Sequence, residues 1–238
     1  MTANHQYLGS ELDLFALASN WKAYIRREIG PYVKGHVLEV GAGIGGTTRS
    51  LINGRERSWT CLEPDRELAK RIALTIKNNS RSVDQMPKVI VGNIDHPGCN
   101  RNYDTILYID VLEHIENDEL EIRKAVQKLS QKGCLIVLAP AHQYFYSSFD
   151  AKIGHFRRYQ QKRLLSIPPA DTKLLRIRYL DCVGCLASFA NKLILRSGLP
   201  TQRQIATWDR VMVPLSRLFD PLFGHKIGKS IFVIWQKK

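Results

Sequence analysis

The sequence lacks any long uninterrupted apolar run. Its longest apolar stretch, residues 183–199, contains one amide and two basic side chains, and it falls short of the roughly 20 residues that a transmembrane helix needs. The first residues show neither the basic start nor the apolar segment of a signal peptide. We therefore expect a cytoplasmic protein without a transmembrane segment, and the composition leaves a peripheral membrane contact open.

Patterns of metal ligands are also scarce. Of the five cysteines, Cys182 and Cys185 form a single C-x-x-C, whereas a structural zinc site needs four ligands. Residues 139–142 read Ala-Pro-Ala-His, which does not supply the several oxygen ligands that magnesium requires. The sequence thus predicts no bound metal and cysteines that need no pairing.

Negative charge is scarce in the second part of the chain. Residues 1–140 carry 18 Lys and Arg against 17 Asp and Glu, whereas residues 141–238 carry 17 against 5 and contain no Glu. The resulting net charge of +12 in the second part favours an anionic ligand or an anionic surface. A basic face can also serve only solubility, so both interpretations stay open.

Residues 37–46 combine an apolar segment, a glycine turn and an acidic residue. The run around Leu38 predicts a buried strand, and the glycines after it let the backbone turn sharply and approach a ligand. A helix is predicted next, over residues 47–53, with its unpaired amides toward that ligand. This arrangement is typical of a nucleotide-binding turn.

Two cofactor classes fit a turn of this kind. Gly41, Gly43 and Gly46 satisfy the G-x-G-x-x-G spacing of proteins that bind NAD or FAD. Glu39, however, precedes the first glycine, and a carboxylate there would repel a pyrophosphate. S-adenosylmethionine carries an ammonium and a sulfonium and no phosphate, so its charge suits Glu39 better.

The turn resembles the first motif, E-x-G-x-G-x-G, of the class I S-adenosylmethionine-dependent methyltransferases. Glu39, Gly41, Gly43 and Gly45 match it. Residues 110–114, Asp-Val-Leu-Glu-His, resemble the fourth motif of that family. The resemblance implies a seven-stranded, mostly parallel, doubly wound α/β sheet with S-adenosylmethionine as cofactor. The segment Gly-His-Phe-Arg-Arg-Tyr further on resembles a bacterial branch associated with small molecules, glycans and natural products.

Other apolar segments appear in the order expected of this family. Residues 59–62, 89–91, 103–108 and 134–138 each predict a strand, and residues 230–235 predict the terminal strand. A proline two residues after the fifth segment ends that strand, because proline cannot continue a hydrogen-bonded ladder.

Side chains at the ends of these strands are the expected cofactor ligands. Glu63 follows the second strand, where a carboxylate can accept hydrogen bonds from both ribose hydroxyls. Asn93 and Asp95 compete for the edge of the adenine. The resemblance implies this cofactor-binding set: Glu39, Gly41, Gly43, Gly45, Glu63, Pro64, Asn93, Ile94, Asp95, Asp110, Val111 and His114.

We expect a single domain over residues 1–238. Residues 1–35 would form an N-terminal lid helix, and residues 36–140 the cofactor-binding half. Residues 141–238 would form the acceptor-facing half, with a helical insertion at 182–222 before the last strand.

Aromatic, histidine and arginine side chains gather after the fifth strand, where the active-site rim of an open α/β sheet lies. His155 is the first candidate for a general base and His142 the second, because histidine takes up a proton near neutrality. An alternative interpretation makes Arg158 and Tyr159 a structural clamp, for example through Glu113. The predicted acceptor-binding residues are Trp21, Tyr24, Tyr146, Arg157 and Arg158.

The sequence therefore predicts an S-adenosylmethionine-dependent methyltransferase that methylates an oxygen or nitrogen of a small or amphipathic molecule, and the positive charge favours an anionic one. One alternative is an RNA or DNA methyltransferase, which the positive charge favours. No Asn-Pro-Pro-Tyr-like segment or appended RNA-binding module supports it, so a stable nucleic-acid partner is not expected. The other alternative is a non-catalytic scaffold that binds the cofactor without reaction.

Overall fold

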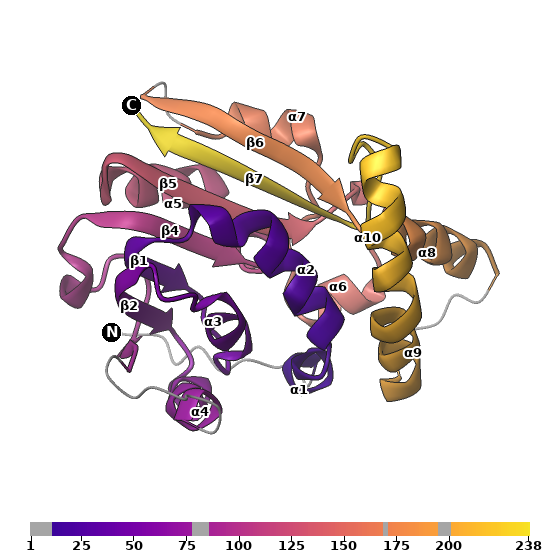
Figure 1. The fold of residues 1–238 in the computed structure, drawn as a ribbon, viewed down its shortest axis with the longest axis horizontal. Helices are drawn as coiled ribbons and strands as arrows, with labels where there is room; N and C mark the ends of the chain where they lie inside the picture. Colours follow the sequence, from indigo (N-terminus) through magenta and orange to yellow (C-terminus); the bar gives the residue numbers. More distant parts are fainter. Residues whose placement is uncertain (1–10, 78–85, 169–170, 195–200) are drawn as a thin grey trace.

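The computed structural model describes residues 11–77, 86–168, 171–194 and 201–238, and seven strands in this part of the chain form one sheet (Figure 1). They are β1 (Gly35–Val40), β2 (Glu56–Glu63), β3 (Lys88–Val91), β4 (Tyr103–Ile109), β5 (Leu129–Pro140), β6 (Thr172–Leu180) and β7 (Ser230–Lys237). Their order is β3-β2-β1-β4-β5-β7-β6. β1 to β5 run parallel, and β7 is antiparallel to both neighbours, which confirms the expected fold class.

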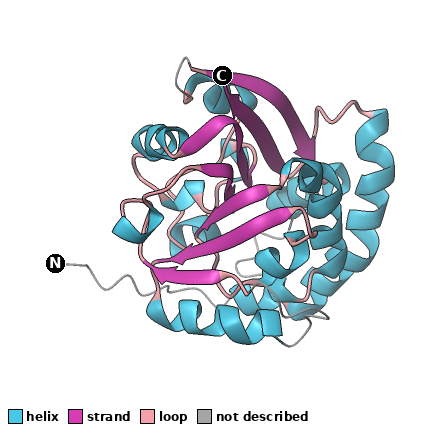
Figure 2. Cartoon of the chain, turned by 60° about the vertical axis from the view of Figure 1, so that its left-hand side comes forward, coloured by secondary structure: helices cyan, strands magenta, loops and turns pink. Residues whose placement is uncertain are grey.

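Helices cover both faces of the sheet (Figure 2). They are α1 (Glu11–Ala16), α2 (Ser19–Ile29), α3 (Gly46–Leu51), α4 (Arg66–Lys77), α5 (Asp118–Gln127), α6 (Ser148–Lys152), α7 (Gln161–Ser166), α8 (Cys182–Ile194), α9 (Gln202–Thr207) and α10 (Val213–Leu222). Shorter helical turns are η1 (Gly30–Tyr32), η2 (Pro97–Cys99), η3 (Leu112–His114), η4 (Gln143–Phe145) and the π-helical η5 (Trp208–Met212). No helix within the described ranges is both long and apolar enough to cross a membrane.

Successive residues of the central strands enter two separate hydrophobic cores. In β1, Leu38 and Val40 pack into the core that α5 and α7 cover, whereas Val37 packs into the core that α2, α4 and α10 cover. Because both faces of the sheet are buried, the central strands are continuous apolar segments in the sequence. This is why the five parallel strands could be predicted.

The sixth strand was not located from the sequence, and its position explains why. β6 lies at the edge of the sheet beside β7, and much of its first half is exposed. Lys173, Arg176 and Arg178 therefore interrupt the apolar pattern. The predicted start of β5 also changes, from residue 134 to Leu129.

Several predicted helix boundaries are also corrected. The lid helix expected within residues 1–35 is divided into α1 and α2, and α2 ends at Ile29, because Pro31 has no backbone N–H to continue the helical hydrogen bonds and a 3-10 turn follows. The helix expected over residues 47–53 is the shorter α3. α8 is described to Ile194, and the rest of the stretch predicted up to residue 199 lies outside the described residues.

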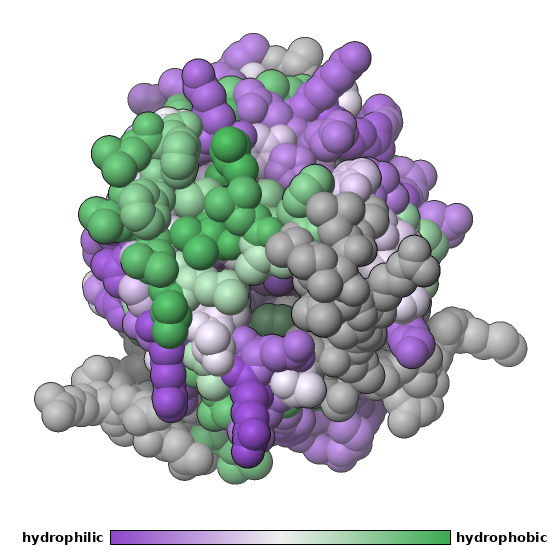
Figure 3. Space-filling view, turned by 90° about the vertical axis from the view of Figure 1, so that its right-hand side faces the viewer, coloured by the Kyte–Doolittle hydropathy of each residue, from purple (hydrophilic) through white to green (hydrophobic). Residues whose placement is uncertain are grey.

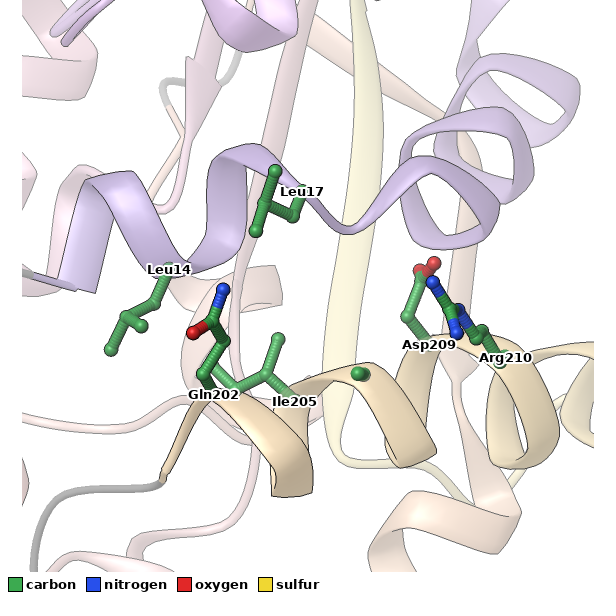
Figure 4. A pocket seen from close by; sticks show the side chains of 7 residues that line it. Leu14, Leu17, Gln202, Ile205, Asp209 and Arg210 are labelled. Carbon is green, nitrogen blue, oxygen red and sulfur yellow. The ribbon is translucent and has the colours of Figure 1, made fainter.

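A contact between distant parts of the chain joins η5 to the first turn of α2. Asp209 of η5 lies beside the first turn of α2 (Figure 4), where it accepts hydrogen bonds from the backbone N–H groups of Trp21 (2.8 Å) and Asn20 (3.2 Å). These amides have no partner inside the helix, so the carboxylate acts as the cap that the preceding alanine cannot provide. Leu14 of α1 and Ile205 of α9 line a small cavity of about 230 Å³ next to it.

Candidate active site

A cavity of about 780 Å³ opens at the carboxyl ends of β1, β4 and β5. The glycine turn after β1 and the residues after β4 form one side, while α1, α2, α8 and α9 contribute the other walls. Open α/β sheets bind their ligands at this edge. The cavity is therefore the candidate active site.

The glycine turn is tightly packed against residues that lie outside the cavity lining. Gly41 has φ +68°, and a Cβ there would lie 2.5 Å from Cγ2 of Val111, so a larger residue would clash as well as strain the backbone. The amide of Gly43 donates a 2.7 Å hydrogen bond to Oε2 of Glu63. Gly45 packs against Ile72 of α4. Val111, Gly45 and Glu63 thus support the turn from outside the cavity lining.

Glu39 lies at the end of β1, is 2% exposed and borders the cavity. Its Oε2 accepts hydrogen bonds from the hydroxyl of Thr48 (2.7 Å) and the indole N–H of Trp59 (3.0 Å). Burial raises the pKa of its carboxyl to about 7, and the nearby charge of Glu63 adds to this effect. A cationic ligand group in the cavity would reverse the shift.

The predicted ribose and adenine contacts lie at the periphery. Besides the Gly43 amide, the Glu63 carboxylate accepts a hydrogen bond from the amide of Asp65 (2.9 Å). Asn93 Oδ1 accepts from the amide of Asp95, whose carboxylate forms a 2.6 Å ion pair with Lys124. These residues, together with Pro64 and the buried Ile94, are outside the cavity lining, so their roles toward the cofactor stay predictions.

Lys22 of α2 also lines the cavity, although the sequence did not mark it as a site residue. Its Nζ donates to the carbonyls of Phe15 (3.0 Å) and Ala16 (2.6 Å), and it lies 3.5 Å from where a Cβ on Gly46 would stand. Burial and the charge of Arg49 lower the pKa of its ammonium to about 8. In the sequence, Lys22 is one lysine within the predicted lid helix, and a single lysine on a helix indicates only a solvated side chain.

On the opposite wall, Asp150 organises the histidine and arginine of the predicted acceptor loop. Its carboxylate is fully buried and accepts hydrogen bonds from Nδ1 of His155 (2.9 Å) and from Nε and Nη2 of Arg158 (2.8 and 2.9 Å). It also accepts hydrogen bonds from the backbone amide and the hydroxyl of Ser147. Hydrogen bonds from His155 and Arg158 hold the pKa of Asp150 well below its usual range, despite burial. Because an ionised carboxylate only accepts, Nδ1 of His155 carries a proton and Nε2 faces away from Asp150.

Asp110, Glu113 and His114 continue this wall. Asp110 has φ +54° and an exposed side chain that lines the cavity, and partial loss of solvent around its carboxyl raises its pKa to about 6. Burial and the charge of Asp110 raise the pKa of Glu113 well above its usual range. Burial and the charge of His155 lower the pKa of His114 to about 4. A cluster of titratable groups with shifted pKa values in a cavity is typical of a functional site.

The structure brings some predicted residues into the cavity and leaves others elsewhere. Glu39, Gly41, Gly43, Asp110, His114, His155, Trp21, Tyr146 and Arg158 line it. His142 instead stacks on Tyr179 with ring centroids 5.0 Å apart. Tyr24 is fully buried and donates a 2.8 Å hydrogen bond to Asp220. Arg157 donates to the carbonyls of residues 115 and 116 (2.7 Å each).

The clamp proposed for Arg158 and Tyr159 exists with different partners. Arg158 pairs with Asp150 rather than Glu113, within its own loop. The hydroxyl of Tyr159 donates to the carbonyl of Leu112 (3.1 Å) and lies 3.0 Å from Asp118. Tyr159 therefore ties the loop to η3 and α5, and Arg158 stiffens the loop itself.

Comparisons with known proteins agree with this arrangement. A model of the family described as "Methyltransferase domain" matches residues 38–135. Ajmaline N-methyltransferase of Rauvolfia serpentina is 24% identical, and the match covers 77% of this chain and 58% of that relative. The chain thus spans little more than half the length of this curated relative.

Solved structures show the same fold at low sequence identity. Coclaurine N-methyltransferase bound to N-methylheliamine and SAH gives a TM-score of 0.62 at 15% identity, covering 98% of this chain and 83% of that chain. N-methyltransferase NodS from Bradyrhizobium japonicum WM9 gives 0.55 at 12% identity, covering 95% and 98%. The strand order and these structures show that the chain has the fold of S-adenosylmethionine-dependent methyltransferases, and residues 38–135, which include the glycine turn, match the methyltransferase domain.

Proposed function

We propose that this protein transfers the methyl group of S-adenosylmethionine to a small or amphipathic acceptor. The observation that carries this proposal is that the glycine turn with Glu39 and the cluster around His155 border the same cavity. Its volume of about 780 Å³ lies in the upper part of the usual range for ligand pockets, so cofactor and acceptor can meet there. In this proposal residues 36–140 hold the cofactor and residues 141–238 the acceptor, beneath a lid from residues 1–35.

Two charged side chains fit the methionine end of the cofactor. Glu39 borders the cavity, and within the described part of the chain its carboxylate has no cation among its hydrogen-bond partners, so the cofactor ammonium would supply one. Lys22 lies over the turn on the other side, where its ammonium would bind the methionine carboxylate. This pairing orients the sulfonium toward the wall that carries His155.

Methyl transfer is a near-linear displacement in which positioning supplies much of the barrier reduction, roughly 7–11 kcal/mol for well-oriented groups. Because Asp150 accepts the hydrogen bond from Nδ1 of His155, the other ring nitrogen, Nε2, is available to the acceptor. His155 is therefore the residue that we propose activates the acceptor. His142 keeps the second rank, because stacking on Tyr179 directs its ring to β6.

The acceptor side of the cavity is mainly apolar, with Trp21, Trp208, Met212 and Ala187 among its walls. This lining supports an amphipathic acceptor whose apolar body packs under α1 and α9. Lys229 also borders the cavity, and it would meet an anionic group on the acceptor. Relatives that methylate the alkaloids in their names, ajmaline and coclaurine, support a small-molecule acceptor.

The test is calorimetry followed by a transfer assay. S-adenosylmethionine and its demethylated product should both bind, and Glu39→Ala should weaken binding while Glu67→Ala, which changes an exposed side chain of α4, should not. A screen with the methyl-labelled cofactor would then identify the acceptor among hydroxyl, amine and acidic compounds. Tight NADH binding without any response to S-adenosylmethionine would overturn the proposal, and binding without turnover would favour the scaffold alternative.

We also propose that an anionic lipid surface presents the acceptor to this protein. Figure 3 shows an apolar patch on the side of the molecule that carries α8 and α10, and large apolar side chains of these two helices and of the turn after α10 are exposed. They are Leu186, Phe189, Leu215, Leu218, Leu222 and Phe223. The exposed Arg210 and Lys226 lie near the two ends of α10 and complement anionic headgroups.

Vesicle co-sedimentation tests this surface with a matched pair of variants. Leu218 on α10 and Leu74 on α4 are both 63% exposed. We expect binding to phosphatidylglycerol vesicles, weaker binding to phosphatidylcholine vesicles, and loss of binding in Leu218→Glu but not in Leu74→Glu. Equal behaviour of the two variants, or no binding to either vesicle, would exclude this lipid contact.

A further inference from the structure

Three side chains on the polar wall of the cavity can converge on one point. We propose that Glu113, His114 and His155 bind a divalent transition-metal cation of the Zn²⁺ type. Two imidazoles and one carboxylate are the protein ligands of many catalytic zinc sites, which keep a further position for water or substrate. Imidazole ligands favour such a cation over Mg²⁺, which prefers oxygen ligands only.

The distances between the donor atoms support this assignment. One donor atom from each residue lies within 4.8 Å of the other two. Nε2 of His155 is 3.9 Å from Oε1 of Glu113, and the two imidazole rings are 4.5 Å apart at 83°. Ligands bound tetrahedrally at about 2.0–2.1 Å lie roughly 3.4 Å from one another, so the site closes by shifts of about 1 Å.

Glu113 is the observation that points to a ligand. It is 1% exposed, and neither of its carboxylate oxygens has a hydrogen-bond partner among the described residues. The 3.9 Å separation from His155 is too long for a hydrogen bond. A buried carboxyl group without partners is costly, and a cation at this position would satisfy both oxygens.

The two histidines, in contrast, are already oriented by other groups. Asp150 accepts Nδ1–H of His155, which leaves Nε2 directed toward Glu113. The ring of His114 hydrogen-bonds to the backbone of Ile153 and Gly154. Metal-binding histidines usually donate their second N–H to a carboxylate or a backbone carbonyl in this way, which fixes the ring and its tautomer.

The cation would extend the proposed methyl transfer, and this part of the inference rests on that function. A hydroxyl oxygen of the acceptor would take the open coordination position, where its pKa falls. The oxygen loses its proton to water and forms the new carbon–oxygen bond. The carbon–sulfur bond breaks with its electron pair going to sulfur, which neutralises the sulfonium. The acceptor would thus be a hydroxyl-bearing molecule, and His155 would activate it through the bound cation instead of by direct removal of its proton.

The binding test uses the full chain without an affinity tag, stripped of metal by a chelator. We expect one equivalent of Zn²⁺ to bind in competition with a chromophoric chelator, and at least a tenfold loss of affinity in both Glu113→Gln and His155→Asn. His142→Asn, which changes a histidine outside the cavity, should bind like the unmodified protein. Equal Zn²⁺ affinity in all four proteins, or no binding, would overturn the inference.

Co²⁺ provides a readout that needs no variant. Coordination by two imidazoles and a carboxylate in a four- or five-coordinate site gives intense visible absorption, whereas a spectrum equal to that of aqueous Co²⁺ would refute the site. Calorimetry with S-adenosylhomocysteine checks the cofactor site separately. Unchanged cofactor binding together with lost metal binding would place the defect at the metal, and failure of cofactor binding would count against the proposed function alone.

Discussion

Binding of S-adenosylmethionine should release a proton from Glu39. In the protein without a cation beside it, burial raises the pKa of this carboxyl from 4.5 to about 7. The cofactor ammonium favours the charged carboxylate and lowers that pKa again. Glu63 and the thiol of Cys61 are the other titratable groups coupled to Glu39, and both lie on β2.

The magnitude follows from the size of the pKa shift. If the bound-state pKa returns to its ordinary value, the dissociation constant should be roughly eightfold larger at about pH 6 than at about pH 7.5. For the protein without cofactor, the effect of rising pH on folding stability has the opposite sign to its effect on cofactor affinity. Because the folded pKa exceeds the unfolded one, Glu39 destabilises the fold as the pH rises from about 4.5 to about 7, by up to about 3 kcal/mol.

Calorimetry in buffers with different ionisation enthalpies measures the released proton directly. Glu39→Gln serves as the comparison, since it keeps the shape and cannot titrate. The variant should bind with weaker affinity, release no proton at this site and lose the pH dependence between these two values. Equal proton release by both proteins, or affinity that rises toward low pH, would refute the placement of the ammonium at Glu39.

Three further substitutions test the supports of the cavity. Asp209→Ala should lower stability by about 1–2 kcal/mol in denaturant titrations, because the amide of Trp21 loses its cap; an unchanged midpoint would contradict this role. Tyr24→Phe should cost about 1–3 kcal/mol by removing the buried donor to Asp220, without changing cofactor affinity. Glu63→Ala should weaken S-adenosylmethionine binding roughly tenfold to hundredfold by calorimetry, and equal affinity in a folded variant would exclude it from the site.

The sequence was sufficient to predict the central strands and the glycine turn, because their information is local. A buried parallel strand must be apolar along its whole length, and Gly41 must be glycine where φ is +68° and Val111 lies beneath it. The edge strand β6 gave no such signal, since much of it is exposed and its basic residues interrupt the apolar pattern.

Contacts over long sequence separations were beyond the same reasoning. Asp209 caps a helix 188 residues away, and nothing near α2 indicates which carboxylate will do so. His155 and Arg158 were predicted at the active-site rim, but the sequence did not show that Asp150 of α6 would pair with both. Glu113 was assigned to a family motif, and only the fold places His155 within 3.9 Å of it.

Ion pairs in the structure account for part of the positive charge in the second half of the chain. Arg163 pairs with Asp118 (2.6 Å), and Arg178 pairs with Glu28 (2.9 Å), so basic side chains of the second half bind acidic ones of the first. Part of the +12 charge therefore joins the two halves and is unavailable for steering an acceptor. Such pairs are partly exposed and each contributes about 0–1 kcal/mol, which salt reduces. The test is to measure thermal stability and the Michaelis constant of the acceptor at low and high salt. A fall in stability with an unchanged Michaelis constant would show that this charge stabilises the fold. A rise in the Michaelis constant at constant stability would show that the charge attracts the acceptor.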